Sequence, residues 1–442
     1  MRRHLDRLRG WLFLPFVFFS LTIPCFADVA PRVDTGDTAW IMISSALVFF
    51  MMPGLAFFYG GLVRKKNVLS ILMQCFVTIC LISLQWFLFG YSLTFGPDVN
   101  GVIGNFAWAG LRGVGLEPFP AYAPTIPHQA FMLYQAMFAV ITPALILGAF
   151  AERMKFSAFC VFMVLWSTFV YNPVTHWIWG LGGFLRQAGT LDFAGGLVVH
   201  VNAGIAALAA ALYMGRRQGF PLRISPPHNL PLAVLGAGML WFGWFGFNAG
   251  SALCSGQLAV SAFVATHAAG SAAGLTWGIL DWIFNKRPTV LGMITGAVGG
   301  LAAVTPASGF VNLWGALAIG VGVSMICYWV VVFVKAKFAY DDSLDVFGVH
   351  GMGGIWGSIA VGLFGTQAVN PAGANGLFYG GHTAQLVVQL KATAMTTVYS
   401  LLATFLLLWV VDHLIGLRVS ESDERIGLDL TQHREVGYTL LD

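Results

Sequence analysis

Two histidines of this chain lie in the most informative sequence contexts. His200 follows Asp192 by eight residues, and His350 follows Asp342 by eight residues. Each pair belongs to a long apolar, glycine-rich stretch, one in each half of the chain. Ionisable groups inside a bilayer are costly, so an intramembrane histidine marks a functional-site hypothesis. Two histidines at matched positions indicate a duplicated fold with its site where the repeats meet.

The chemistry open to such a pair is proton and hydrogen-bond exchange. A neutral imidazole both donates and accepts a hydrogen bond, and two facing rings can pass a proton between them. The alternative is a pair of structural histidines bonded to backbone carbonyls, which the duplicated positions disfavour. No HExxH or comparable spacing is present, so we expect neither a metal site nor a cofactor.

The aspartates suit a structural role first. Asp192 directly precedes FAGGLVVH and predicts an N-cap for a helix that starts at the next residue, where its charge is also favourable. Direct binding of a cation is the alternative, and we give Asp192 long-range cation attraction as a second effect. We expect Asp341, Asp342 and Asp345 to cap the later histidine helix in the same way.

Embedded aromatic residues form a third group. Phe138, Trp179, Trp244 and Phe247 lie among polar neighbours, and Ser251 follows Phe247 by one helical turn. Most aromatic residues in such a chain pack in the core or at the membrane interface. Aromatic faces with one hydroxyl would, however, bind a small cation by cation–π attraction and a hydrogen bond, without a full negative charge.

Composition gives the class of protein that must position these residues. The 442 residues are 57% hydrophobic and only 10% charged, whereas a soluble domain carries about 25% charged residues. Long apolar runs favour helices over a barrel. We therefore predict an all-α polytopic membrane protein. No GxSxG, HExxH or paired-aspartate motif supports an enzyme.

We predict eleven transmembrane helices. Their ranges are 38–62, 68–96, 128–152, 156–179, 193–214, 229–250, 258–284, 288–307, 312–336, 345–366 and 386–415. Helices 1–5 and 6–10 would form an inverted-topology repeat around a central pore, because five is odd and the second half must enter from the other side. The matched Asp…His pairs then open helices 5 and 10, GLAFFYGGLV echoes WFGWFGFNAGS, and helix 11 is peripheral.

The positions of basic residues set the orientation. With the mature N-terminus outside, loops on the inner side carry most of the lysines and arginines: Arg64, Lys65, Lys66, Arg153, Lys155, Arg216, Arg217, Arg223, Lys286, Arg287, Lys335 and Lys337. The outer segments carry Arg32, Arg112 and Arg186. The positive-inside rule therefore predicts a periplasmic N-terminus and a cytoplasmic C-terminus in the inner membrane.

The two termini lie outside this transmembrane domain, 28–416. Four arginines, an apolar run and the small-x-small site Cys25-Phe26-Ala27 predict a signal peptide over 1–27. An uncleaved anchor or an extra helix is the alternative. Residues 417–442 are expected to form a cytoplasmic tail, too short for an appended signalling domain.

Six motifs then resemble one known family. They are PGLAFFYGGLVRKKN, GAFAERMKF, LDFAGGLVVHVNAG, WFGFNAGS, DDSLDVFGVHGMGGIWG and ERIGLDLTQH, in that order over residues 38–442. The chain resembles the ammonium transporters of the Amt/Mep/Rh superfamily, on the bacterial Amt branch. The resemblance implies an eleven-helix homotrimer with a pore in each subunit, and a trimeric PII protein as the cytoplasmic partner.

The resemblance also implies roles for individual residues. Trp179 and Ser251, with Phe138 beside them, correspond to an outer ammonium site, and Phe138 and Phe247 to a stacked gate. His200 and His350 correspond to the twin histidines of the pore, beside the pore-lining Trp244. Asp192 corresponds to an aspartate near the outer site.

Two positions depart from the family pattern. Arg434 stands where relatives usually have glycine, which would alter the packing of the tail. His267 stands where many relatives have asparagine, and we interpret it as a packing or helix–helix hydrogen-bond residue.

The function expected is transport: NH4+ binds outside, loses a proton and crosses as NH3 past the twin histidines, with the proton travelling separately. Methylammonium is the expected analogue. A passive NH3 gas channel, and an ammonium sensor that signals through its tail and a PII protein, are the alternatives. The intact pore residues and the short tail favour transport.

Overall fold

The computed structural model describes residues 32–222 and 226–438. The expected signal peptide, 1–27, lies outside these residues, so its assignment stays a prediction.

Helices make up most of the described chain. The α-helices are α1 (Thr35–Leu62), α2 (Val68–Gln85), α3 (Tyr91–Phe95), α4 (His128–Phe150), α5 (Phe156–Trp166), α6 (Asn172–Trp179), α7 (Phe184–Gln187), α8 (Asn202–Met214), α9 (Leu230–Ala249), α10 (Gln257–Asn285), α11 (Val290–Val304), α12 (Leu313–Trp329), α13 (Lys335–Phe338), α14 (Met352–Phe364), α15 (Ala384–Ile415), α16 (Glu421–Ile426) and α17 (Leu428–His433). Five π-helical segments are η2 (Trp86–Gly90), η4 (Ser167–Tyr171), η5 (Gly196–Val201), η7 (Val330–Val334) and η8 (Phe347–Gly351). The 3₁₀ segments are η1 (Lys65–Asn67), η3 (Ala109–Leu111), η6 (Gly250–Ala252) and η9 (Leu377–Tyr379).

Two small antiparallel hairpins interrupt the helices. They pair β1 (Asp98–Val99) with β2 (Ile103–Gly104), and β3 (Pro118–Phe119) with β4 (Ala123–Pro127). Both lie in the connection between α3 and α4, which the sequence analysis left without structure.

The predicted membrane spans agree with the structure to within a few residues at most ends. Within the described residues, 10 helices are long and apolar enough to cross a membrane. The predicted span 288–307 is a shorter apolar helix, Val290–Val304. It ends before Pro306, which has no N–H to continue the helical hydrogen bonds. The all-α, multi-pass membrane class is thus confirmed.

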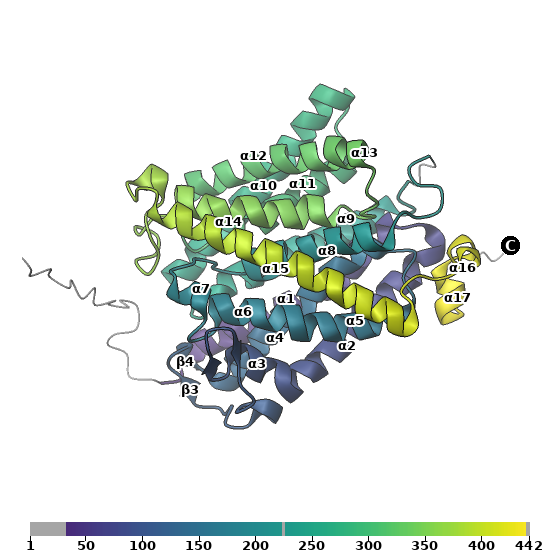
Figure 1. Ribbon diagram of the computed structural model, residues 1–442. Coiled ribbons are helices and arrows are strands. Elements are labelled where there is room, and N and C mark those ends of the chain that lie inside the picture. Colours follow the sequence, from purple (N-terminus) through teal and green to yellow (C-terminus); the bar gives the residue numbers. More distant parts are fainter. Residues whose placement is uncertain (1–31, 223–225, 439–442) are drawn as a thin grey trace, which may run out of the picture.

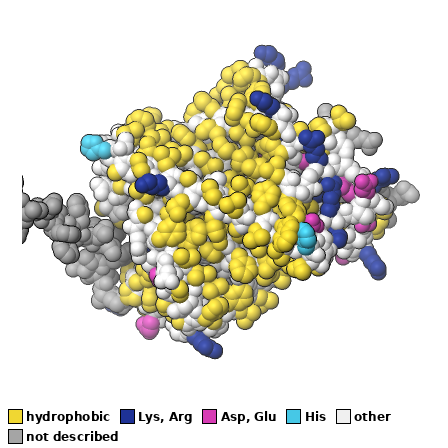
Figure 2. Space-filling model, viewed as in Figure 1, with side chains coloured by type: hydrophobic (Ala, Val, Ile, Leu, Met, Phe, Trp, Pro, Cys, Tyr) yellow, Lys and Arg dark blue, Asp and Glu magenta, His cyan; other side chains and the backbone are white. Residues whose placement is uncertain are grey.

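The long helices run side by side as one bundle, with α15 crossing its outer face (Figure 1). The hairpin of β3 and β4 lies at one end of the bundle, called here the hairpin end, and α16 and α17 lie at the other, called the tail end. Figure 2 shows a broad apolar surface between the ends and a cluster of charged side chains at the tail end. An apolar belt of this kind is what contact with lipid tails requires.

Corresponding elements of the two halves share unusual local structure. Both histidine segments, η5 and η8, are π-helical, and so are η4 in the fourth span and η7 in the ninth. The first helices of each half, α1 and α9, pack against each other along much of their length. These matches support the duplication inferred from the Asp…His spacing.

The tail packs onto the start of α2 rather than extending away. The side-chain oxygen Oδ1 of Asn67 accepts a hydrogen bond from the Leu428 N–H at 2.8 Å. In return, Oδ1 of Asp429 accepts one from the Ser70 N–H at 2.8 Å. Both acceptors are buried. The pair of bonds fixes α17 to the tail end of the bundle.

Arg434 ends α17 in a conformation that suits glycine. Its φ is 57°, in the left-handed region, where a Cβ costs about 1–2 kcal/mol. We expect Arg434→Gly to stabilise the docked tail by about 1 kcal/mol, roughly a fivefold shift in its equilibrium. Slower hydrogen exchange of the Leu428 and Ser70 amides would measure this.

Arg434→Ala is the matched control, because it removes the side chain but keeps the strained Cβ. Equal slowing of exchange in the alanine and glycine variants would contradict the role assigned to backbone strain.

Candidate functional site: a twin-histidine pore

The structure brings His200 and His350 into direct contact inside the bundle. Their Nδ1 atoms lie 3.3 Å apart, and the ring planes are inclined by only 14° with centroids 5.3 Å apart. Both side chains are buried. A hydrogen bond between two Nδ1 atoms requires one to donate and the other to accept, so the pair shares one proton. Nε2 of His200 has no hydrogen-bond partner among the described residues.

Both histidines lie in π-helical segments, η5 and η8. Such segments widen one turn of a helix and recur at functional sites. The helices that carry them also approach very closely, since a Cβ on Gly204 would lie 2.1 Å from the Gly351 nitrogen. Only glycine therefore allows the two backbones to meet at this point. The contact lies one helical turn beyond His200 and next to His350 in the sequence.

Asp192 anchors the first of these segments. Its carboxylate accepts hydrogen bonds from the backbone N–H groups of Gly195, Gly196, Leu197 and Val198, at 2.6–3.2 Å. Burial raises the pKa of Asp192, and these four bonds counter that rise. Helical structure begins at Gly196 rather than at the predicted residue 193. The geometry agrees with the structural role favoured for this residue.

Asp342 is the counterpart in the second half, and it is less fully satisfied. Its Oδ2 accepts a hydrogen bond from the Phe347 N–H at 2.8 Å, whereas its buried Oδ1 has no hydrogen-bond partner among the described residues. Burial raises the pKa of Asp342 to about 6. The two aspartates are therefore equivalent in position but not in electrostatics.

The expectation that Asp341 and Asp345 also cap this helix is wrong. Asp341 accepts hydrogen bonds from Arg217, at 2.8 Å from its Nη2, and Asp345 pairs with Lys335 at 2.6 Å. Burial opposes ionisation of Asp341, but Arg217 outweighs it and lowers the pKa of that carboxyl. Both carboxylates are thus bound by basic side chains, Arg217 from a distant part of the chain and Lys335 from α13.

The aromatic residues predicted for the site form a continuous row that reaches His200 through Trp244 and Phe247. Phe138 and Phe247 have ring centroids 4.5 Å apart, with planes inclined at 46°, so they are tilted rather than stacked. Trp179 meets Phe138 edge to face at 5.6 Å. Trp244 stacks on His200 at 5.4 Å. Its indole Nε1 donates to Thr305 at 2.9 Å, which fixes the ring.

Ser251 makes two hydrogen-bond contacts at this site. Its hydroxyl donates to the carbonyl of Phe247 at 2.9 Å. The Oη of Tyr134 lies 2.9 Å from the carbonyls of Gly246 and Phe247 and 3.2 Å from the Ser251 oxygen, and either hydroxyl can donate in that last contact. A hydroxyl oxygen has two lone pairs, so Ser251 keeps at least one of them whichever hydroxyl donates. Sequence reasoning missed Tyr134, although it precedes Phe138 by four residues and so shares its helix face.

Three cavities follow one another along the bundle. The first, of about 270 Å³, lies towards the hairpin end and is lined by Trp179, Asp192 and Ser251 among others. The second, of about 10 Å³, is lined by Phe247, both histidines and Trp244. The third, of about 290 Å³, contains His350 in its lining and opens towards the tail end. We call them the outer cavity, the constriction and the inner cavity.

The comparison with known proteins agrees with this arrangement. The model of the Ammonium Transporter Family matches residues 39–438. The chain belongs to this family. It is 50% identical over 406 residues to an ammonium transporter of Bacillus subtilis, covering 92% of this chain and 99% of the relative. The crystal structure of Saccharomyces cerevisiae Mep2 superposes with a TM-score of 0.84 at 35% identity, covering 90% of each chain. A structure described as a sensor Amt protein has a TM-score of 0.82 at 28% identity, covering 90% of this chain and 98% of its own.

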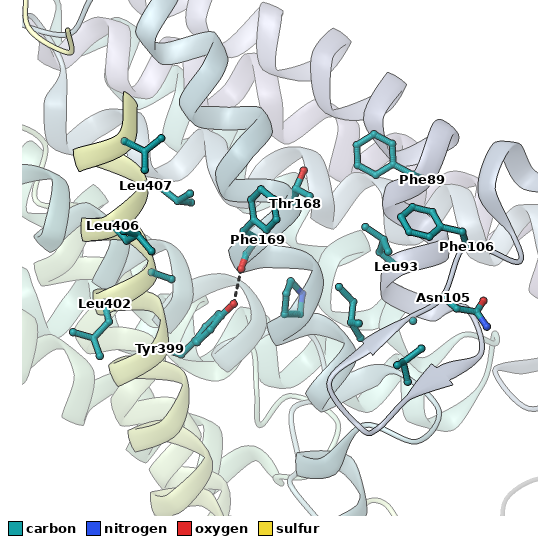
Figure 3. Close-up of a pocket in the computed structure, with 16 residues that line it drawn as sticks. Phe89, Leu93, Asn105, Phe106, Thr168, Phe169, Tyr399, Leu402, Leu406 and Leu407 are labelled. Atoms are coloured by element: carbon teal, nitrogen blue, oxygen red, sulfur yellow. Dashed lines mark hydrogen bonds between the residues drawn. The ribbon is translucent and has the colours of Figure 1, made fainter. Parts of the chain in front are cut away.

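A further cavity of this family member lies apart from the outer cavity, the constriction and the inner cavity. An apolar groove of about 1180 Å³ lies between α15 and the segments η2 and η4 (Figure 3). Tyr399, on its wall, donates its hydroxyl hydrogen to the Phe169 carbonyl at 2.6 Å, and Thr168 bonds to Gln85 at 2.6 Å. Few polar atoms are left to replace the water around an ion. The groove therefore suits apolar groups and not a cation.

Two further expectations concern residues away from the pore. His267 is exposed on α10, with its ring 5.6 Å from Trp241 and 6.0 Å from Phe245. This agrees with a packing role. Within residues 32–222 and 226–438, no group of three or more His, Cys, Asp or Glu side chains could hold a metal ion.

We expect Gly204→Ala to destabilise the protein by about 1–3 kcal/mol or more, because the new methyl group overlaps the Gly351 backbone. The two histidine segments would separate, so transport activity should fall as well. Thermal unfolding of the purified protein and substrate flux into proteoliposomes would measure both effects.

Gly238→Ala in α9 serves as the control, since a Cβ there meets no atom within 4 Å. If Gly204→Ala unfolds at the same temperature as Gly238→Ala, the close backbone contact does not hold the segments together.

Proposed function

We propose that this chain carries ammonium into the cell by separating it into ammonia and a proton. Ammonium binds in the outer cavity between Trp179 and Ser251, loses a proton near the phenyl pair, and crosses the constriction as ammonia. The observation that supports this most is the sequence of three cavities, in which a very narrow apolar constriction containing two shared-proton histidines separates two wider ones.

The outer cavity offers suitable groups for a small cation. The face of Trp179 attracts a cation, and the lone pairs of Ser251 accept an N–H hydrogen bond. Potassium, of similar size, has no hydrogen to donate to Ser251. It therefore loses its hydration shell without equal compensation, which favours ammonium.

The constriction then excludes ions. Its volume of about 10 Å³ is at the lower limit for a single water molecule, so a hydrated ion does not fit. A bare charge at the bilayer centre costs at least about 2.5–3.5 kcal/mol. Ammonium avoids this cost by releasing a proton, an option that potassium lacks.

The proton released has its own route along the histidine pair. Because Nδ1 of His200 and Nδ1 of His350 already share one proton, a second proton arriving from the outer side could be matched by one leaving on the inner side. Transport would then carry net positive charge. A passive gas channel, in which only ammonia crosses, is the alternative for the same pore.

The location and partners form the remainder of this proposal. The excess of basic residues at the tail end supports a cytoplasmic tail in the inner membrane, with the hairpin end in the periplasm. We further propose a homotrimer and a PII-type regulatory protein that docks at the tail end. Both follow from the family resemblance.

A second candidate function is ammonium sensing. The fold similarity to a protein described as a sensor, together with the docked α16 and α17, favours it. In that case ammonium binding in the outer cavity would change the conformation of the tail rather than the flux of ammonium.

Current across proteoliposomes on an ammonium pulse tests transport directly, with a potassium pulse as the control. We expect an inward positive current for ammonium alone. No current with an intact ammonia-driven change in internal pH would indicate a gas channel. Silence in both readouts would contradict transport and favour the sensor.

The histidine pair yields a separate prediction. Replacing His200 and His350 together by alanine should abolish charge movement or allow potassium to pass, because the shared-proton route is lost and the constriction widens. Ammonium currents equal to those of the unmodified protein, with potassium still excluded, would rule out the proton-relay role.

A further inference from the structure

The outer cavity of this transporter contains a cationic side chain, which is unexpected where a cation should bind. Arg186 lies on α7 and lines the same cavity as Trp179, Asp192 and Ser251. Its Nη1 donates a hydrogen bond to the carbonyl oxygen of Trp179. Trp179 in turn donates from its indole Nε1 to the carbonyl of Asp192 at 2.8 Å. Arg186 is thus tied to the proposed binding site.

Among the described residues, no carboxylate forms a direct ion pair with Arg186. The carboxylate of Asp192 is taken up by four backbone N–H groups. Asp98, at the same end of the bundle, is 2.8 Å from His176 and also accepts from the Gly101 N–H. The guanidinium is therefore exposed at the cavity without a direct carboxylate partner, and its charge acts together with that of Asp192 in the same lining.

Such a charge has two effects on ammonium. It repels the cation and so weakens binding, and it favours the neutral form over the charged one, which promotes loss of the proton. It also occupies the Trp179 carbonyl, an acceptor that ammonium could otherwise use. Because Arg186 is exposed, the repulsion is moderate and screened by salt.

We propose that Arg186 is a specificity-determining residue of the outer cavity, whose positive charge weakens ammonium binding there and favours its deprotonation. This inference rests on the proposed binding of ammonium between Trp179 and Ser251. It predicts that the affinity of the outer cavity for ammonium is lower, and the release of the proton faster, than without this charge.

A purely structural role must be separated from this one. Trp179 is the last residue of α6, and a cation near a helix C-terminus is favourable in any case. Arg186→Gln keeps a donor for the Trp179 carbonyl but removes the charge. Arg186→Lys keeps the charge and a donor. A role of the charge predicts that only Arg186→Gln changes the affinity for ammonium. A purely capping role predicts the same change of affinity in both variants.

The experiment is an equilibrium titration of the purified full-length protein with ammonium chloride, monitored by tryptophan fluorescence, at low and high ionic strength set with sodium chloride. At low ionic strength we expect Arg186→Gln to bind ammonium about 3–10-fold more tightly than the unmodified protein. The difference should shrink at high ionic strength, and Arg186→Lys should resemble the unmodified protein.

Arg112→Gln is the matched control. Arg112 is also predicted on the outer side, and its removal changes the net charge equally, but it does not line the cavity. The midpoint of ammonium binding in Arg112→Gln should equal that of the unmodified protein. Equal midpoints for Arg186→Gln and the unmodified protein would overturn the inference, as would equal shifts in the glutamine and lysine variants.

The binding readout does not depend on transport. Tighter binding by Arg186→Gln in a protein that moves neither charge nor ammonia would support the role of Arg186 while contradicting proposed transport. Normal transport with unchanged ammonium binding by Arg186→Gln would support transport and contradict the role of Arg186. No saturable signal in any variant would overturn the inference together with the binding site.

Discussion

The structure depends on one contact, the shared-proton hydrogen bond between His200 and His350 in the middle of the bundle. The two imidazoles are buried, and their Nδ1 atoms share one hydrogen bond without requiring a formal charge. To meet, they need helices that approach more closely than ordinary side chains allow, which Gly204 and Gly351 make possible. The surrounding aromatic rings then leave only a narrow constriction between the two wider cavities.

Duplication supplies this geometry, but the two halves have diverged in their electrostatics. Asp192 and Asp342 occupy corresponding positions before η5 and η8. Asp192 is held by four N–H groups, which favours a fixed anion. Asp342 keeps one buried oxygen without a described partner, and burial raises its pKa to about 6. The duplicated fold is therefore electrostatically asymmetric at the two corresponding aspartates.

The sequence was sufficient for much of the fold, because span length and hydrophobicity are local properties. Most predicted spans agree with the observed helices, and the equal Asp…His spacings located both histidines. The ring contact itself followed from duplication, since equivalent residues of an inverted repeat meet near its axis.

The features that the sequence does not predict depend on tertiary contacts. Asp341 and Asp345 were expected to cap a helix, yet Arg217 and Lys335 bind them. Arg217 and Asp341 are 124 residues apart in the chain, so no local pattern reveals this pair. The π-helical form of the histidine segments and the docking of the tail on Asn67 also arise from tertiary contacts. Arg186 was noted only as an outer basic residue, because its place in the cavity depends on how α7 folds back.

In the proposed mechanism, ammonia and its proton pass the constriction by separate routes. The most direct test is the ratio of charge moved to nitrogen transported, measured in the same proteoliposomes from integrated current and isotopically labelled ammonium. Separate routes for ammonia and its proton predict a fixed ratio near one elementary charge per nitrogen atom, independent of the ammonium gradient. A ratio near zero with substantial nitrogen flux would contradict it, because ammonia would then cross alone.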